Sequence, residues 1–343
     1  MNEPAVSVII PAYNSARYIA QCIDSVLAQT HRTAEILIVD DGSTDDTRAV
    51  VSAYRDPRIR YIEAPHRGTA ATRNTALDLA SGKYLAFLDA DDLWRPAMLE
   101  RQVSVMEHDP RLVCSFTNFV RFMDGTGELL PDQFTFFPEL ATLPVAGCAG
   151  GKARIVDGDA FVQLIGFHDI PAYTVCMMFR RALVAEVRQN ESLGRCEDLE
   201  YAARAFMRGK VAFIREVLVD VRRHDSNVTG NISLMALDKL SAMLSLQSAV
   251  DTPVRRAALN DRLVKARIDA ATALIRSGRR LRGLEHYTKA LTVPGSALRK
   301  LKGTARIAYE LLNSAGVRER AVTPGATGSR APADAAWKTT PRH

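Results

Sequence analysis

The sequence predicts an α/β fold built on a doubly wound, mostly parallel sheet. Over the first hundred residues, four short apolar runs alternate with stretches of helical character, the order expected of parallel strands joined by crossover helices. The apolar runs are nearly continuous, as in strands that are covered on both faces. Sheets of this kind bind ligands beyond the carboxyl ends of their strands, so polar residues at those ends are the first candidates for a site.

The predicted elements follow one another along the chain. Strands are expected at Val6–Ile10, Ile36–Val39, Ile59–Ile62 and Tyr84–Leu88, with helices at Ala16–Gln29, Asp45–Tyr54, Ala70–Ala80 and Pro96–Glu107. After Cys114 the pattern loosens, and glycines and prolines predict a long irregular segment. A second ordered block is expected to hold a strand at Tyr173–Phe179, a helix at Leu199–Met207 and a strand at Val211–Val221.

Three regions are expected along the chain. Residues 1–233 form the α/β domain, with halves at about 1–114 and 115–233. Residues 234–320 form a basic, helical C-terminal appendage, and residues 321–343, which contain several prolines and glycines, form a disordered tail.

Charge is unevenly distributed along the chain. Residues 1–250 carry 26 basic and 32 acidic side chains, whereas residues 251–343 carry 19 basic and 7 acidic ones. The acidic part would on average repel phosphates, so an evenly basic nucleic-acid-binding protein is disfavoured and no nucleic-acid partner is expected. The basic remainder would attract polyanions or an anionic bilayer surface.

Hydropathy and cysteine usage indicate the cellular compartment in which the protein is expected. No run approaches the ~18 to 20 continuous apolar residues of a membrane span, and the first residues lack the pattern of a signal peptide, so a cytoplasmic protein is expected. The cysteines are scattered and lack Cys-x-x-Cys spacing, which predicts reduced thiols: Cys22, Cys114, Cys148, Cys176 and Cys196.

Polar residues follow the first two predicted strands. The first strand runs into Tyr13 and Asn14, where a base could stack on the tyrosine, although a strand with a simple helix cap explains this run equally well. The second strand ends in Asp40, Asp41 and Gly42. A tight turn explains the glycine but not two adjacent carboxylates, which suit the imide N–H of uracil or a ribose hydroxyl.

A third strand end carries Asp89, Asp91 and Asp92 within four positions. Unit charges ~4 Å apart repel by about 4 kcal/mol at an effective dielectric of 20, so these carboxylates are costly together. A hard divalent cation removes that cost, and Mg²⁺ typically takes one or two protein carboxylates together with substrate phosphates. A metal site is therefore favoured over a solvated acidic turn.

Together these stretches resemble the family 2 glycosyltransferases of GT-A fold. The resemblance covers roughly residues 5–230 and rests on Ser-Val-Ile-Ile-Pro-Ala-Tyr-Asn at 7–14, Ile-Val-Asp-Asp-Gly-Ser-Thr-Asp at 38–45, Arg73-Asn74, and the Asp-x-Asp of residues 89–91. It implies a nucleotide-diphosphate-sugar donor, usually UDP-linked, a Mg²⁺ or Mn²⁺ cofactor, and inversion at the anomeric carbon. Residues 1–114 then form the nucleotide half and residues 115–233 the acceptor half.

The resemblance also implies roles for single residues. Asp91 would hold the metal, and Arg73 would contact the nucleotide or its phosphates. The remaining donor-binding positions are Pro11, Ala12, Tyr13, Asn14, Asp40, Asp41, Asp89 and Ala90.

The family places its catalytic base in a Glu-Asp pair that opens a helix. Glu197 and Asp198 match this pattern, which makes Asp198 the base and Glu197 its supporting neighbour. Acids in the first turn of a helix are also ordinary partners of the helix dipole. The segment 221–229 resembles the Arg-x-His segment that closes many family domains; His224 is either a further metal ligand or an ordinary surface histidine.

The implied partners are the nucleotide-sugar donor and a glycan or lipid-linked acceptor. In the C-terminal region, basic clusters at 279–282 and 299–302 alternate with apolar residues, which fits peripheral contact with the inner face of a cell membrane or a simple solvated surface. Two other function classes fit the sequence less well. A dinucleotide-binding oxidoreductase is disfavoured because the first strand lacks Gly-x-Gly-x-x-Gly, and a non-catalytic sugar-nucleotide-binding or scaffold protein would not require Asp89, Asp91 and Asp198 together.

Overall fold

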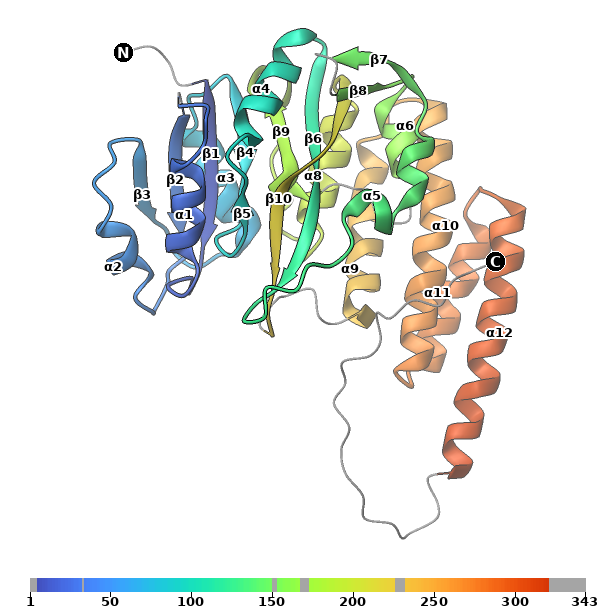
Figure 1. Ribbon diagram of the computed structural model, residues 1–343. Helices are drawn as coiled ribbons and strands as arrows, with labels where there is room; N and C mark the ends of the chain where they lie inside the picture. Colours follow the sequence, from blue (N-terminus) through green and yellow to red (C-terminus); the bar gives the residue numbers. More distant parts are fainter. Residues whose placement is uncertain (1–4, 33, 150–152, 167–172, 226–231, 321–343) are drawn as a thin grey trace.

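The computed structural model describes residues 5–320 except 33, 150–152, 167–172 and 226–231. The first half alternates strands and helices as predicted (Figure 1). Its elements are β1 (Val6–Ala12), α1 (Ile19–Leu27), β2 (Ala34–Asp40), α2 (Thr47–Ser52), β3 (Ile59–Glu63), α3 (Thr69–Leu79), β4 (Tyr84–Phe87), β5 (Leu93–Trp94) and α4 (Met98–His108). The second half of the sheet region holds β6 (Leu112–Met123), α5 (Gln133–Phe136), β7 (Val145–Ala149), β8 (Ala153–Val156), α6 (Ala160–Ile165), β9 (Met177–Arg180), α7 (Arg181–Val184), α8 (Glu197–Phe206) and β10 (Lys210–Arg223).

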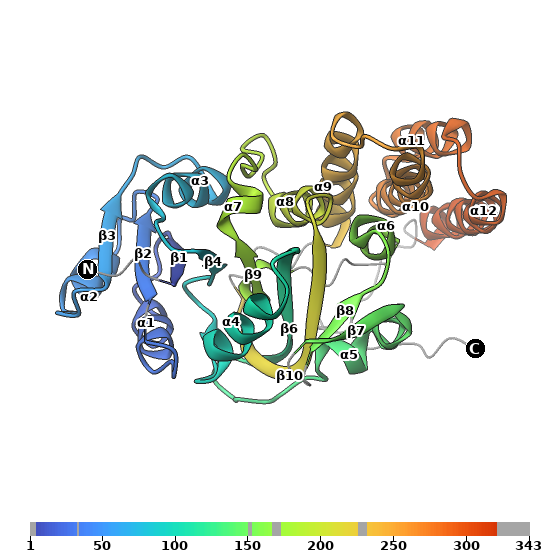
Figure 2. The same ribbon diagram turned by 90° about the horizontal axis from the view of Figure 1, so that it is seen from above.

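One mixed sheet runs through the molecule in the order β3-β2-β1-β4-β9-β6-β10-β8-β7, with β5 paired to β10. Strands β3, β2, β1 and β4 are mutually parallel, while β9 is antiparallel to both β4 and β6. Helices α3 and α8 lie on one face of the sheet and α1 and α4 on the other (Figure 2). This covering of both faces explains why the first strands are almost entirely apolar.

The prediction of a long irregular segment after Cys114 was wrong at its start. Residues 112–123 form β6, which pairs in parallel with β10 over most of its length. The apolar pattern is broken there because Ser115, Thr117 and Asn118 point polar groups into the protein interior, where they are at most 3% exposed. The predicted strand at Tyr173–Phe179 is also shorter, since Thr174–Cys176 form a 3-10 turn before β9.

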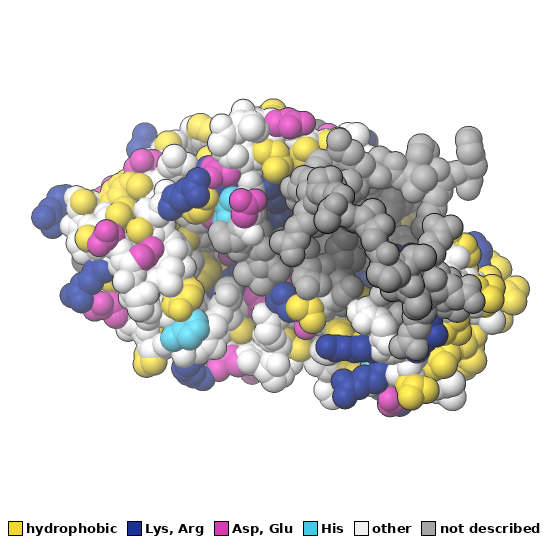
Figure 3. Space-filling model, turned by 90° about the horizontal axis from the view of Figure 1, so that it is seen from below, with side chains coloured by type: hydrophobic (Ala, Val, Ile, Leu, Met, Phe, Trp, Pro, Cys, Tyr) yellow, Lys and Arg dark blue, Asp and Glu magenta, His cyan; other side chains and the backbone are white. Residues whose placement is uncertain are grey.

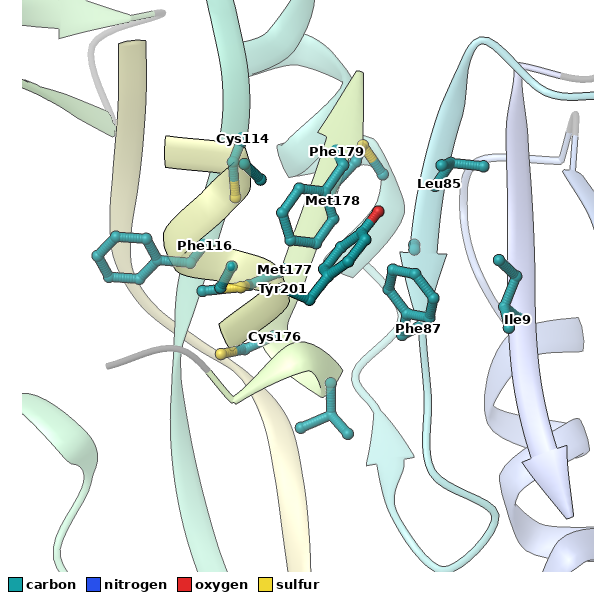
Figure 4. Packing of buried hydrophobic residues seen from close by; sticks show 14 of the residues in the cluster. Ile9, Leu85, Phe87, Cys114, Phe116, Cys176, Met177, Met178, Phe179 and Tyr201 are labelled. Atoms are coloured by element: carbon teal, nitrogen blue, oxygen red, sulfur yellow. The ribbon is translucent and has the colours of Figure 1, made fainter. Parts of the chain in front are cut away.

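The core lies along the middle of this sheet. Tyr201 of α8 packs edge-on against Phe87 of β4 and Phe179 of β9, with ring centroids 5.8 and 5.3 Å apart (Figure 4). All three side chains are fully buried. This contact fixes α8 on the sheet only three positions beyond Asp198, so the packing also positions the predicted catalytic base.

The predicted helical C-terminal region is confirmed. It consists of α9 (Ile232–Ser245), α10 (Pro253–Arg276), α11 (Arg280–Thr292) and α12 (Ala297–Arg320). The first two helices belong to the same core as the sheet, because Leu240, Leu246, Leu259 and Leu263 join its buried cluster. The first part of the C-terminal region thus extends the main core, whereas α12 lies at the outer edge of the molecule (Figures 1 and 2). The predicted disordered tail lies outside the described residues.

Two further expectations can be compared with the structure. Within the described ranges, no helix combines the length and apolar character needed to cross a membrane. Among the described cysteine side chains, Cys22, Cys114, Cys176 and Cys196 are free thiols, and the first three are buried. Burial raises the pKa of the Cys22 and Cys114 thiols well above the ordinary value, so these cysteines act as packing residues.

Candidate active site

The predicted site residues gather where β1, β2 and β4 end. These strands run in register and in the same direction, so their carboxyl ends share one edge of the sheet. Acidic side chains and histidines lie on the corresponding face of the molecule (Figure 3). The N-terminus of α8 approaches the same edge, because Glu197 forms an ion pair with Arg73 of α3.

The loop after β1 is tied to the loop after β2. The backbone N–H of Asn14 donates to Oγ of Ser43 at 2.9 Å, and Oδ1 of Asn14 accepts from the N–H of Thr44 at 2.8 Å. Asn14 adopts a left-handed conformation with φ of 48°, which asparagine tolerates better than most residues. The alternative of a simple helix cap does not describe this loop, since α1 starts after Tyr18 without a side-chain cap. Pro11 and Ala12 are the last residues of β1 and lead into this loop.

Tyr13 presents an exposed aromatic face at this edge. Its side chain is 48% exposed and stacks on His66 with ring centroids 4.3 Å apart. His66 in turn lies 2.9 Å from Oδ2 of Asp41 through Nδ1. A flat ligand such as a nucleobase is suited to such an aromatic pair.

The two adjacent carboxylates after β2 have internal partners. Asp40 is 3% exposed and accepts hydrogen bonds from the N–H of Ser43 at 2.7 Å and from the hydroxyl of Tyr61. Asp41 accepts from the N–H groups of Arg67 at 2.8 Å and Gly68 at 2.9 Å. Asp40 is therefore held by internal partners, and its place in the donor site stays a prediction, while Asp41 shapes the loop that carries His66.

Arg73 joins the Asp-x-Asp segment to the start of α8. Its guanidinium is buried and donates to Oδ1 of Asp89 at 2.6 Å and to Oε1 of Glu197 at 3.0 Å. Burial alone would lower the pKa of Arg73, but the carboxylates of Asp89 and Glu197 outweigh that effect and raise it. Asp89 remains 38% exposed in its side chain, so one end of this bridge is open to a ligand.

Asp91 and His224 form the second polar pair of the site. Nε2 of His224 lies 3.0 Å from Oδ2 of Asp91, and the imidazole stacks on Tyr18 with centroids 4.8 Å apart. Burial and then the neighbouring charge of Asp89 raise the pKa of Asp91. Asp92 is buried and accepts from the N–H of Arg222 at 2.8 Å, so it ties the Asp-x-Asp turn to β10.

These residues fit a divalent cation that takes part of its coordination from a substrate. In the described part of the chain, no group of three or more His, Cys, Asp or Glu side chains is arranged to hold a metal. Asp91 and His224 nevertheless offer two potential ligand atoms close together, Oδ2 of Asp91 and Nε2 of His224. Mg²⁺ usually binds through one or two carboxylates plus substrate phosphates, and imidazole is a common ligand of transition metals.

Asp198 lies in the first turn of α8, next to Glu197, which is paired with Arg73. Burial, followed by the charge of Glu197, raises its pKa to about 7, although Arg73 acts in the opposite direction. Cys196 precedes the helix in a left-handed conformation with φ of 62°, which is rare for a non-glycine residue and typical of functional sites. A carboxylate that titrates near neutral pH is suited to proton transfer. By contrast, Glu200 in the same turn forms a 2.7 Å ion pair with Arg204.

A hydrogen-bonded clamp holds the segment before α8 and was not predicted. Oδ1 of Asn74 accepts from the N–H of Gln189 at 2.8 Å, and Nδ2 of Asn74 donates to the carbonyl of Gln189 at 2.9 Å. Nδ2 also donates to Glu191 at 2.9 Å. The sequence signals Asn74 only through its place beside Arg73, and nothing in it signals Gln189, because the clamp uses the backbone of that residue.

Two residues near the site are buried. Trp94 is 3% exposed and donates from Nε1 to the carbonyl of Val175 at 2.8 Å, so it is a core residue. Arg222 is 6% exposed and donates to Asp124 and Gln21.

The fold is that of GT-A glycosyltransferases. The crystal structure of S. aureus TarS in complex with UDP-GlcNAc matches with a TM-score of 0.64 at 17% identity and covers 92% of each chain. The mannosyltransferase PcManGT from Pyrobaculum calidifontis, in complex with GDP-Man and Mn²⁺, matches with a TM-score of 0.55 at 20% identity, over 94% of this chain and 89% of its own.

The family model described as glycosyl transferase family 2 matches residues 7–188, and the chain belongs to that family. Among relatives, the Escherichia coli UDP-Glc:alpha-D-GlcNAc-diphosphoundecaprenol beta-1,3-glucosyltransferase WfgD is 40% identical over 131 residues, which is 38% of this chain. The matched part spans about half of that relative, at 48% of its length.

Proposed function

We propose that this chain is a metal-dependent, inverting glycosyltransferase. It moves a sugar from a nucleotide-diphosphate donor, with UDP as the nucleotide, to a hydroxyl of a glycan or lipid-linked acceptor in bacterial polysaccharide or glycoconjugate synthesis. The observation that carries the proposal is the bridge from Asp89 through Arg73 to Glu197, which brings the Asp-x-Asp segment and Asp198 to one edge of the sheet.

The donor assignment rests on both the site and the relatives. The exposed stack of Tyr13 on His66 offers a face for the base, and the side chain of Asp89 is 38% exposed. TarS was crystallised with UDP-GlcNAc, and the name of WfgD specifies UDP-Glc, which favours UDP over other nucleotides. The lipid diphosphate acceptor in the name of WfgD likewise supports a lipid-linked acceptor.

Asp198 is the proposed base. It takes the proton of the acceptor hydroxyl as that oxygen bonds to the anomeric carbon, while the bond from that carbon to the diphosphate oxygen breaks. Attack opposite the leaving group inverts the configuration, and the nucleoside diphosphate departs. General base catalysis of this kind contributes ~10²- to 10⁴-fold in rate. Glu197 assists through its ion pair with Arg73.

Asp91 and His224 are the proposed metal ligands. A bound Mg²⁺ or Mn²⁺ would neutralise charge on the departing diphosphate. The Mn²⁺ in the PcManGT complex supports a metal in this fold. The protein is proposed to act in the cytoplasm, with peripheral contact at the inner face of the membrane.

The test is to incubate full-length protein and Mn²⁺ with a panel of UDP-, GDP- and dTDP-sugars and to follow release of the free nucleotide diphosphate. Selective release from a UDP-sugar is expected. Failure to bind any of these donors would refute the donor assignment, and binding without turnover across a broad acceptor panel would favour a sugar-nucleotide-binding protein.

A further inference from the structure

Helix α12 carries an apolar stripe that faces away from the protein. Its packed side holds Gly303, Ile307 and Glu310, which are buried. The opposite side holds six exposed apolar residues across four turns: Leu298, Leu301, Ala305, Ala308, Tyr309 and Leu312. The leucines at 298, 301 and 312 are 61%, 68% and 75% exposed, and Tyr309 is 62% exposed.

The stripe follows from the period of the helix. At 3.6 residues per turn, positions 298, 301, 305, 308, 309 and 312 fall on one face, opposite positions 303, 307 and 310. The packed side is fixed by α10: Arg276 of α10 pairs with Glu310, Asp269 with Arg306, and Asp261 with Arg299. These three ion pairs fix which side of α12 faces α10, and α12 itself lies at the outer edge of the molecule (Figures 1 and 2).

Basic residues flank the stripe. Helical spacing places Lys302 and then Arg306 along one side of it, whereas Lys300 falls near the packed side and donates to the carbonyl of Leu291 at 2.8 Å. Between residues 279 and 313 the chain has eight basic and two acidic side chains. Of the two acids, Glu285 pairs with Lys289, and Glu310 is buried against Arg276. Arg299 and Arg306 pair with Asp261 and Asp269 of α10, so the positive charge beside the apolar stripe comes mainly from Lys302.

A second apolar and basic group lies at the start of α11, just after α10 ends. Leu281 is 84% exposed and stands between Arg280 and Arg282. The ion pair between Arg276 and Glu310 brings this turn beside the C-terminal part of α12. Seen from below, basic and apolar side chains gather over the helical part of the molecule (Figure 3).

We propose that this α12 face, defined by Leu298, Leu301, Ala305, Ala308, Tyr309 and Leu312, docks on an anionic phospholipid bilayer. Helices with an apolar face and Lys or Arg on their flanks lie in the membrane interface, and their binding grows with buried apolar area and with attraction to anionic lipids. A second copy of the chain fits less well, because pairing two α12 helices through this stripe would set a basic flank against a basic flank. This docking face specifies where the membrane contact of the proposed function would lie, and the inference therefore rests on the proposed function.

The experiment measures flotation of full-length protein with vesicles of phosphatidylcholine alone and with added phosphatidylglycerol. No donor is present, so the outcome is independent of the donor assignment. The test variant combines Leu298→Gln, Leu301→Gln and Leu312→Gln, which removes the stripe without changing the charge. Val254→Gln is the control, since Val254 is 64% exposed on α10 and lies outside the stripe.

Wild type and the Val254→Gln control should float with anionic vesicles, less so at high salt, and the triple variant should bind on the order of tenfold more weakly. Unchanged thermal unfolding and donor binding of the triple variant would show that its fold is intact. The proposal is overturned if the wild-type protein does not float with anionic vesicles, or if the triple variant floats with them as well as the wild type does. It is also overturned if the stripe instead supports a dimer in light scattering that the triple variant abolishes.

Discussion

Asp198 is the residue whose chemistry depends most on its surroundings. An aspartate in water is ionised well below neutral pH, but burial and the charge of Glu197 raise the pKa of Asp198 to about 7. The shift has opposite consequences for activity and for stability. A base of this pKa accepts protons effectively near pH 7, while its charged form destabilises the folded protein relative to the unfolded chain.

The first prediction concerns the pH dependence of turnover. Because Asp198 must be ionised to act as a base, kcat/KM should rise about tenfold per pH unit below pH 7 and level off above it. Asp198→Asn should lower kcat by ~10²- to 10⁴-fold and leave donor affinity nearly unchanged. Glu186→Gln is the control, because Glu186 is exposed. Normal turnover by Asp198→Asn would mean that another residue acts as the catalytic base.

The same substitution should stabilise the protein at high pH. Between the ordinary aspartate pKa and about 7, the folded state binds a proton that the unfolded chain has lost, so this group costs stability increasingly as pH rises through that range. Asp198→Asn should therefore raise the free energy of unfolding by about 1–3 kcal/mol at pH 8 and have little effect at pH 3. Urea unfolding at both pH values measures this, and an unchanged stability at pH 8 would argue against a raised pKa.

Arg73 leads to a prediction about stability. Removing this buried guanidinium leaves Asp89 and Glu197 without their cation, so Arg73→Met should cost about 2–4 kcal/mol in urea unfolding at pH 8. Arg188→Met, which breaks the exposed pair with Asp78, should cost about 0–1 kcal/mol. Equal effects of the two substitutions would mean that the bridge contributes no more than a surface ion pair.

At the scale of elements, the Asn74 clamp connects α3 to the segment that leads into α8. Two hydrogen bonds to the backbone of Gln189 and one to Glu191 fix this segment, and Asp198 follows it. Asn74→Ala should lower kcat more than it raises KM for the donor, and should speed hydrogen exchange of residues 189–196. Thr75→Ala on the same helix is the control, because the hydroxyl of Thr75 donates to the carbonyl of Ala71 within α3. Unchanged exchange in Asn74→Ala would exclude the positioning role.

The sequence predicted some elements much better than others. The strands β1, β2 and β4 were predicted because helices cover both faces of the sheet there and leave nearly pure apolar runs. Strand β6 was missed because Ser115, Thr117 and Asn118 are polar yet buried within it. In the site, chemical patterns indicated the acidic residues, whereas the internal partners of Asp40 and the backbone clamp on Gln189 arise only from tertiary packing.

At the scale of the whole molecule, the C-terminal helices are part of one structure with the sheet. Leu240, Leu246, Leu259 and Leu263 of this region are at most 3% exposed within the main core. A chain ending near Ser233 would expose the apolar partners of these leucines to water. Each Å² of apolar surface uncovered in this way lowers the stability of the fold by about 25 cal/mol. Such a truncation should lose cooperative unfolding and tend to aggregate. A soluble, cooperatively unfolding product would show that the sheet region folds alone.

The central claim is that the edge formed by β1, β2 and β4 binds a nucleotide-sugar through a metal held by Asp91. Calorimetric titration of a UDP-sugar into the full-length protein with and without Mn²⁺ tests it most directly, with Asp91→Asn and Asp198→Asn measured alongside. Wild type and Asp198→Asn should bind the donor far more tightly with Mn²⁺, and Asp91→Asn should lose that metal dependence. Equal binding with and without Mn²⁺, or an unaltered metal response in Asp91→Asn, would contradict the account.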